Sequence, residues 1–129
     1  MNIANLSKSN LGVKNGKLSP LSKKPNCVST QTEFSSKRVA PVKFSGEAAE
    51  FMAKVASAMA SMPGAVIKQQ SENYVYVVFT SKIMRFKDDV EVYLDEEEGL
   101  MHFRSASRVG YSDLGVNAKR YDAFISKLK

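Results

Sequence analysis

Two runs of alternating apolar and polar residues, separated by an acidic loop that ends in glycine, constrain the fold most strongly. The runs are residues 89–94 and 101–107, and the loop, DEEEG, spans residues 95–99. Alternation with a period of two is typical of strands with one buried face, and a short loop containing glycine joins antiparallel neighbours. The sequence therefore predicts a β-hairpin around this loop.

The same alternation predicts the register of the hairpin. When Asp95 pairs with Leu100, Leu94 falls opposite Met101 and Val92 opposite Phe103, both on one apolar face. A slip of one residue would set apolar against polar residues throughout. The predicted pairs are Leu94 with Met101, Tyr93 with His102, Val92 with Phe103 and Glu91 with Arg104.

One face of this predicted hairpin carries both arginines and carboxylates. Residues two apart share a face of a strand, so Asp89 and Glu91 are expected to lie beside Arg104. Arg108, and Arg85 if the strand continues backwards, are expected to join them. Such a face is either a structural ion-pair network or a pocket for an anionic ligand. The residue pattern favours the network.

Helical periodicity predicts two helices, at residues 46–62 and 117–128. Pro63 and Gly64 end the first helix, and Ser45 and Asn117 are expected to cap the two N-termini. The apolar stripe of each helix is predicted to face the core. These stripes are Ala48, Phe51, Met52, Val55, Met59 and Met62 in the first helix, and Tyr121, Phe124, Ile125 and Leu128 in the second.

Two further strands, Ala65–Gln70 and Tyr74–Thr80, are predicted between the first helix and the hairpin. The order α-β-β-β-β-α predicts an α+β fold, with a small antiparallel sheet of about four strands and both helices packed on it. Residues 1–10 are polar and aperiodic and are expected to form a flexible tail. Residues 11–43 are rich in turn formers and are expected to lie, extended, along a domain formed by residues 44–129.

Positive charge is concentrated ahead of the predicted domain. Residues 1–43 hold eight Lys and Arg against one acid, whereas residues 44–129 hold eleven against twelve. A near-neutral domain argues against a nucleic-acid surface. Binding of a polyanion or a membrane surface through the basic N-terminal segment is an alternative. No apolar run approaches the roughly 18 residues of a membrane span.

The chain has one cysteine, Cys27, and one histidine, His102. They exclude an internal disulfide and a Cys/His zinc site within one chain. The acidic run 95–98 has no EF-hand spacing, so neither a metal nor a cofactor is expected. If the protein is an enzyme, Cys27 is the candidate nucleophile and His102 the candidate base.

Two motifs resemble the bacterial and plastid family called domain of unknown function 1499. One is "RSASRVGYSDLGVN" at residues 104–117, preceded by "MRFKDDVEVYLDEEEG", and the other is the Pro-Asn-Cys-Val-Ser element within residues 11–31. The resemblance covers about residues 11–128. The family pattern falls on Pro25, Asn26, Cys27, Val28, Ser29, Arg85, Phe86, Asp88, Asp89, Arg104, Ser105, Ser107, Arg108, Gly110, Tyr111, Ser112, Asp113, Gly115, Asn117 and Arg120.

The resemblance implies where a site would lie, and it carries no established activity. Candidate ligand-binding residues are Arg85, Asp89, Arg104, Ser105, Ser107, Arg108, Tyr111, Asp113, Asn117 and Arg120. If the two motifs meet in space, Cys27 is packed near residues 108–113 and is unreactive. Leu21 stands where many members look to have another cysteine, so no thiol pair is implied. The N-terminal segment is Ser/Lys-rich like a transit peptide but resembles the mature domain, so we expect a cytoplasmic protein, with a soluble plastid protein as the alternative.

Residues 104–117 are expected to form an architectural corner between strand and helix. Gly110 and Gly115 permit unusual backbone angles, and Arg104 and Arg108 need carboxylate partners. The available carboxylates are Asp88, Asp89, Glu91 and Asp113. The sequence favours a non-enzymatic binding or scaffold module whose Arg/Asp/Ser/Tyr surface takes a small anionic ligand or a protein partner. A Cys27-dependent enzyme and a polyanion or membrane-surface binder are the alternatives.

Overall fold

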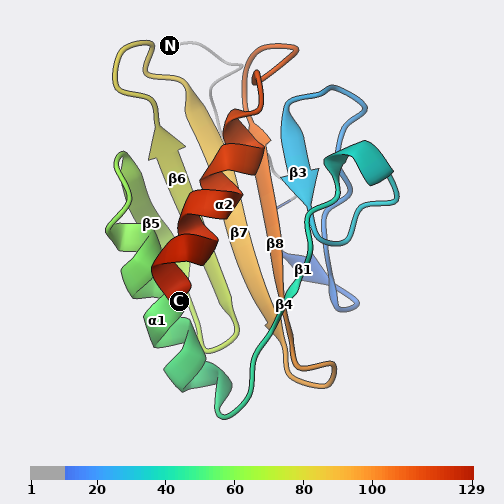
Figure 1. Cartoon of the computed structure of the whole chain (residues 1–129), viewed down its shortest axis with the longest axis vertical. Coiled ribbons are helices and arrows are strands. Elements are labelled where there is room, and N and C mark those ends of the chain that lie inside the picture. Colours follow the sequence, from blue (N-terminus) through green and yellow to red (C-terminus); the bar gives the residue numbers. More distant parts are fainter. Residues whose placement is uncertain (1–10) are drawn as a thin grey trace.

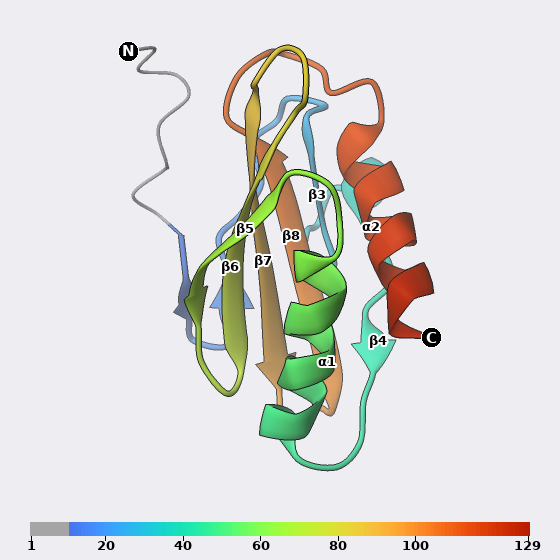
Figure 2. The same cartoon turned by 90° about the vertical axis from the view of Figure 1, so that its left-hand side faces the viewer.

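In the computed structural model, which describes residues 11–129, an antiparallel sheet of six strands carries two helices on one face (Figures 1 and 2). The strands are ordered β3-β8-β7-β6-β5, and β4 also pairs with β8. A two-stranded hairpin, β1–β2, lies against the opposite face (Figure 2). The elements are β1 (Val13–Lys14), β2 (Lys17–Leu18), β3 (Cys27–Ser29), η2 (Ser35–Lys37), β4 (Val42–Lys43), α1 (Ala48–Ala60), β5 (Ala65–Gln70), β6 (Tyr74–Thr80), β7 (Lys87–Asp95), β8 (Leu100–Ser107) and α2 (Val116–Leu128). The expected tail, residues 1–10, lies outside the described residues.

The predicted hairpin and its register are confirmed. Strands β7 and β8 pair from Asp95 with Leu100 through Glu91 with Arg104, and pairing continues to Asp88 with Ser107. Because this register puts the fully buried Val92, Leu94, Met101 and Phe103 on the helix-covered face, burial of that face selects it.

The α+β class is confirmed, but the predicted count of four strands is wrong. Strands β3 and β4 come from the N-terminal segment and pair one after the other with β8, at residues 104–106 and 100–101. They therefore cover a strand that would otherwise form an exposed sheet edge. Strands of two or three residues are too short to show alternation in a sequence, which is why they were not predicted.

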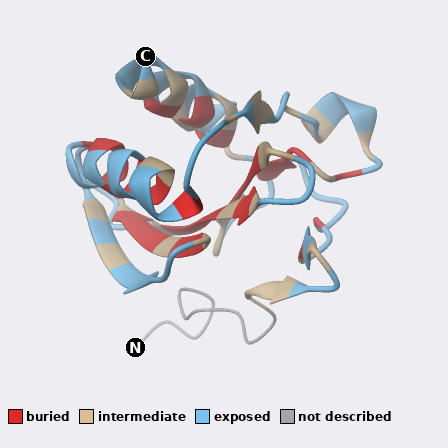
Figure 3. Cartoon of the chain, turned by 90° about the horizontal axis from the view of Figure 1, so that it is seen from below, coloured by how far each residue is buried: buried red, intermediate tan, exposed pale blue. Residues whose placement is uncertain are grey.

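The core lies between the sheet and the helices, where Figure 3 shows the buried residues gathered. The ring of Phe103 on β8 lies 4.6 Å from that of Tyr121 and 5.9 Å from that of Phe124, both on α2. Both predicted apolar stripes face this core. Phe51 is only half-buried and stacks on Phe44, with ring centroids 5.1 Å apart. The Tyr121 hydroxyl donates to the carbonyl of Ala40, and burial raises its pKa to about 12.

Both predicted helix caps are wrong. Glu47, not Ser45, is the N-cap residue of α1, and its side chain makes no capping hydrogen bond. Gly115 occupies the N-cap of α2 with φ 83°, and Asp113 accepts the backbone N–H of Asn117 at 3.0 Å. Asn117 is the second residue of α2. Its side chain is fully buried and makes the hydrogen bonds described below.

Gly64 provides a test of the packing where α1 turns into β5. Its φ is +81°, and an added Cβ would lie 2.5 Å from the carbonyl oxygen of Thr80. Gly46, before α1, has φ +84° but nothing within 4 Å of that position. Gly46→Ala should lower the unfolding free energy by about 1 kcal/mol, from the left-handed backbone alone. Gly64→Ala should lower it by a further ~1–3 kcal/mol from overpacking.

Urea unfolding of the two variants measures this difference directly. Equal losses would show that the backbone at Thr80 moves aside without resistance.

Candidate functional site

The sheet divides the predicted site residues into two groups on opposite faces. Asp89, Arg104 and Arg108 lie on the face away from the helices, where the N-terminal segment covers them. The second group faces α2. It comprises Ser105, Ser107, Asn117 and Arg120, with Asp113 at the start of the helix. The predicted residues therefore do not form one pocket.

Arg108 and Asp89 form a buried bidentate ion pair. Nη2 of Arg108 lies 2.8 Å from Oδ1 of Asp89, and Nε lies 3.0 Å from Oδ2. The Tyr76 hydroxyl donates to the same carboxylate at 2.5 Å. Burial alone would lower the pKa of Arg108, but the bonds to Asp89 outweigh burial and raise it. The Arg108 guanidinium therefore stays charged, and it donates hydrogen bonds within the protein to Asp89 and Tyr76.

Arg104 lies opposite a fully buried carboxylate, Glu91. Its Nη1 is 3.7 Å from Oε1 of Glu91, while Nε and Nη2 donate to the carbonyls of Ser19 and Pro20 at 2.9 and 3.2 Å. Arg104 therefore binds the N-terminal segment to the sheet.

Glu91 completes this attachment. Its Oε2 accepts the Tyr74 hydroxyl at 2.6 Å and the backbone N–H of Gly12 at 2.7 Å. Among the described residues, its Oε1 is the buried side-chain oxygen without a hydrogen bond. Burial raises the pKa of Glu91, although Tyr74, Gly12 and Arg104 act in the opposite direction.

On the helix face, the fully buried amide of Asn117 connects three parts of the chain. Its Nδ2, which carries two hydrogens, lies within 3.0 Å of three acceptors: the carbonyl of Asn26 and the side chains of Ser107 and Asp113. Its Oδ1 accepts the hydroxyl of Ser105 and, at 2.8 Å, a guanidinium N–H of Arg120.

Arg120 completes this network with a third buried ion pair. Its Nη2 lies 2.8 Å from Oδ2 of Asp88, and its guanidinium lies over the ring of Phe79, 4.6 Å from the centroid. Together the three pairs, Arg104 with Glu91, Arg108 with Asp89 and Arg120 with Asp88, form what we call the arginine frame. The frame is neutral overall, so these arginines are not an exposed anion-binding cluster.

Arg85 does not join the polar face. It lies in the loop before β7 with φ 58° and borders a hollow of about 550 Å³ together with Lys82, Val116 and Lys119. The loop turns the chain toward the helix side, which is why extending the strand pattern backwards misplaced this residue.

The Pro-Asn-Cys-Val-Ser element meets residues 108–113, as expected. Asn26 donates to the carbonyl of Gly110 at 3.0 Å, and the N–H of Asp113 donates to the carbonyl of Pro25. Cys27 is buried, with Sγ 3.6 Å from the Lys24 carbonyl and 4.0 Å from Nζ of Lys37.

Cys27 and His102, the two candidate catalytic residues, are far apart. Cys27 pairs with Ala106, four residues along β8 from His102, which is about 13 Å at ~3.3 Å per residue. His102 instead bonds Thr30 through Nδ1 at 2.9 Å and Glu98 through Nε2 at 3.3 Å. The geometry does not support a thiol–imidazole pair.

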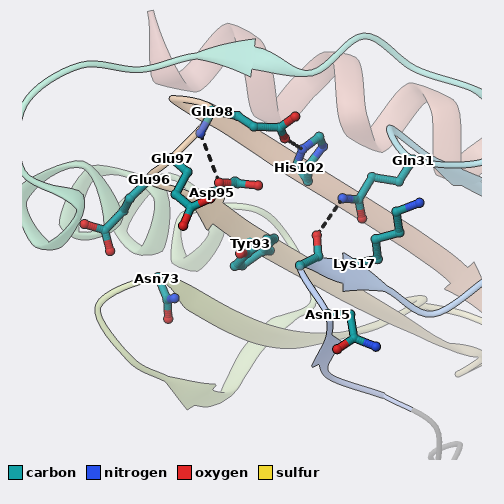
Figure 4. A pocket seen from close by; sticks show the side chains of 11 residues that line it. Asn15, Lys17, Gln31, Asn73, Tyr93, Asp95, Glu96, Glu97, Glu98 and His102 are labelled. Atoms are coloured by element: carbon teal, nitrogen blue, oxygen red, sulfur yellow. Dashed lines mark hydrogen bonds and ion pairs between the residues drawn. The ribbon is translucent and has the colours of Figure 1, made fainter.

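A pocket of about 780 Å³ beside the β7–β8 turn holds the group of described residues that could ligate a metal (Figure 4). One ligand atom each from Asp95, Glu98 and His102 lies within 4.8 Å of the others. Burial, and then the neighbouring carboxylates of residues 95–98, raise the pKa of Tyr93 in the same pocket. The sequence analysis considered only the EF-hand spacing of the acidic run, so it did not identify this group. The predicted hairpin register already placed His102 near Asp95.

Exposed apolar side chains are a feature that the sequence analysis missed. Of the seven large exposed ones in residues 11–129, six lie on two loops at one end of the molecule. Residues 81–87 and 108–116 form these loops, which we call the loop end (Figures 1 and 2). The six are Ile83, Met84, Phe86, Tyr111, Leu114 and Val116. The available signal was a cluster of large apolar residues between two predicted strands.

The fold and site define an α+β protein in which an antiparallel sheet, two helices and buried arginine–carboxylate pairs surround the two signature motifs. A family model described as a protein of unknown function (DUF1499) matches residues 17–128, and the chain belongs to this family. No curated protein matches the chain significantly. Within residues 11–129, neither helix has the length and apolar character needed to cross a membrane.

The Arg108–Asp89 pair can be tested by a double-mutant cycle. Arg108→Ala or Asp89→Ala alone should lower the unfolding free energy by about 3–5 kcal/mol, because each leaves a buried charge unpaired. The double variant should lose ~1–3 kcal/mol less than the sum of the singles. Asp113→Ala is the control: it removes the acceptor of the Gly115 and Asn117 backbone N–H groups and of the Asn117 side-chain amide, should lose about 1–3 kcal/mol, and should add to Arg108→Ala.

Thermal or urea unfolding gives all these values. Single variants with wild-type stability would show that the pair is not structural.

Glu91 should give stability a distinctive pH dependence. The folded protein holds the Glu91 proton more tightly than the unfolded chain, because the folded pKa is raised. Its contribution is therefore fully present below the ordinary carboxyl pKa and declines as the pH rises through the raised value. The unfolding free energy of wild type relative to Glu91→Gln should fall as the pH rises from the ordinary carboxyl pKa, about 4.3, through the raised value. A difference that rises over this range would contradict the assignment.

Proposed function

We propose that the protein is a non-enzymatic binding module that engages its partner through the loop end. The observation that carries this proposal is the gathering of exposed apolar side chains there. Ile83 is 87% exposed and Leu114 is 86% exposed, and each has large apolar neighbours on its own loop. Single exposed apolar residues are ordinary, but a cluster of them marks an interaction site.

The two loops are held together from beneath. The N–H of Arg108 donates to the carbonyl of Lys87 at 3.0 Å, and the Arg108 side chain forms an ion pair with Asp89 on β7. The chain entering α2 is held by Asp113, which accepts N–H groups of Gly115 and Asn117. The loop end is therefore built on rigid elements, as a binding surface needs to be.

Backbone conformation supports the same surface. Leu114 has φ 54° and Arg85 has φ 58°. Both angles lie in the left-handed region, which residues other than glycine, asparagine and aspartate rarely adopt. Leu114 gains no burial in return, because its side chain projects into solvent. Strained residues of this kind concentrate at functional sites.

The arginine frame favours a large partner over a small anion. Arg104, Arg108 and Arg120 each face a carboxylate at 3.7 Å or less, and all three are largely buried. A small anion would have to displace Glu91, Asp89 or Asp88, leaving that carboxylate buried and unpaired. The separation of Cys27 from His102 supports a non-enzymatic role.

Site-specific photo-crosslinking tests the proposal. A benzoylphenylalanine replaces Ile83 or Leu114 in the full chain, expressed in the organism of origin, and a matched protein carries it at Val66. Val66 is 54% exposed but lies on the edge strand β5. The two loop-end positions should yield adducts, of protein or of lipid, well above those from Val66. Equal, background yields at all three positions would overturn the proposal.

A further inference from the structure

We infer that the partner of the loop end is an anionic phospholipid surface. This inference rests on the proposed function and names the partner. The loop end combines exposed apolar side chains with basic ones on its first loop, and exposed Lys119 on α2 borders it. This is the composition that binds at the interface of an acidic bilayer.

The basic side chains alternate with the apolar ones in the first loop. Lys82, Arg85 and Lys87 are interleaved with Ile83, Met84 and Phe86. The hollow of about 550 Å³ between this loop and α2 is lined by Lys82, Arg85 and Lys119 around apolar Phe79 and Val116. Arg120 also lines it, but Asp88 neutralises its charge. The second loop contains one carboxylate, Asp113. Both of its oxygens already accept N–H groups. The loop end is therefore positive and apolar at once.

Negative charge lies at the other end of the sheet. The acidic turn, residues 95–98, joins β7 to β8 at the end opposite the loop end (Figure 1). Strand β7 separates Lys87 from Asp95 by eight residues, about 26 Å at ~3.3 Å per residue. Lys17 lines the pocket beside this turn and Lys43 pairs with Leu100, so two lysines stand against the four carboxylates of residues 95–98. The remaining excess of negative charge favours the orientation in which the loop end faces a negative surface.

The shape of the loop end favours a membrane over a protein. Ile83 and Leu114 project from two separate loops and are almost fully exposed, whereas a protein interface is typically built on a continuous, well-packed patch. Projecting apolar side chains can enter between lipid headgroups while long Lys and Arg side chains reach the phosphates. Tyr111, which is also exposed, has the amphipathic ring favoured at that depth.

Vesicle co-sedimentation of the full chain tests the inference. Vesicles of phosphatidylcholine with phosphatidylglycerol should bind the wild type, and vesicles of phosphatidylcholine alone should not. Each of Lys82→Gln and Lys119→Gln should weaken binding about five-fold. The double variant Ile83→Ser/Leu114→Ser should weaken it at least about tenfold. Added salt should also weaken it.

Matched controls come from the edge strand β5. Val66→Ser and Lys68→Gln change exposed residues of the same types and should leave vesicle binding unchanged. Circular dichroism confirms that each variant is folded. Wild type that fails to bind anionic vesicles, or loop-end variants that bind as well as the controls, would overturn the inference.

The crosslinking experiment separates this failure from failure of the proposed function. Protein adducts from Ile83 and Leu114 without vesicle binding would leave the binding module intact and replace the lipid with a protein. Absence of adducts and of vesicle binding would overturn both.

Discussion

The buried side chain of Asn117 is the contact on which the arrangement of the two signature motifs depends. One amide group bonds the Asn26 carbonyl beside β3, Ser105 on β8 and Arg120 on α2. Water cannot replace these bonds, because the amide is fully buried. Each polar group left without its partner would carry a penalty of about 1–3 kcal/mol. Strand, helix and N-terminal segment are thereby fixed relative to one another by a single residue.

The arginine frame extends this constraint through the sheet. Asp88 and Asp89 are adjacent in β7, so their side chains point to opposite faces. Asp88 holds Arg120 on the helix side, and Asp89 holds Arg108 on the other. Two consecutive carboxylates therefore anchor both ends of the chain segment that carries residues 108–116. Because charges inside are paired, the net positive character of the loop end belongs to exposed lysines and Arg85 rather than to the frame.

Sequence predicted those parts of the molecule that burial alone determines. The hairpin register follows from a period of two and one covered face, so it was predicted pair by pair. Strands β3 and β4 could not be predicted, since their two or three residues are held by backbone pairing to β8. The roles of Ser45 and Asn117 were predicted from local capping preference. For Asn117, tertiary bonds to Asn26 and Ser105 override that preference. For the site, the sequence indicated that Arg108 pairs with a nearby acid. Whether that acid is Asp89 or Asp113 depends on the conformation of residues 108–116, which the sequence pattern did not give.

The exposed loop end depends on the buried arginine frame. Buried ion pairs contribute little net stability compared with apolar residues of similar volume, but they fix geometry strictly. Left-handed angles at Leu114 and Arg85 and solvent-exposed Ile83 lower stability, and they persist only when the surrounding structure determines them. Two pairs of the frame, Arg108 with Asp89 and Arg120 with Asp88, supply that determination, because they hold β7 to the two ends of the second loop. A chain selected for stability alone would have apolar side chains in place of the frame and polar ones on the loops. This chain has the reverse, which is the distribution expected of a rigid support that presents an apolar, basic surface to something outside the molecule.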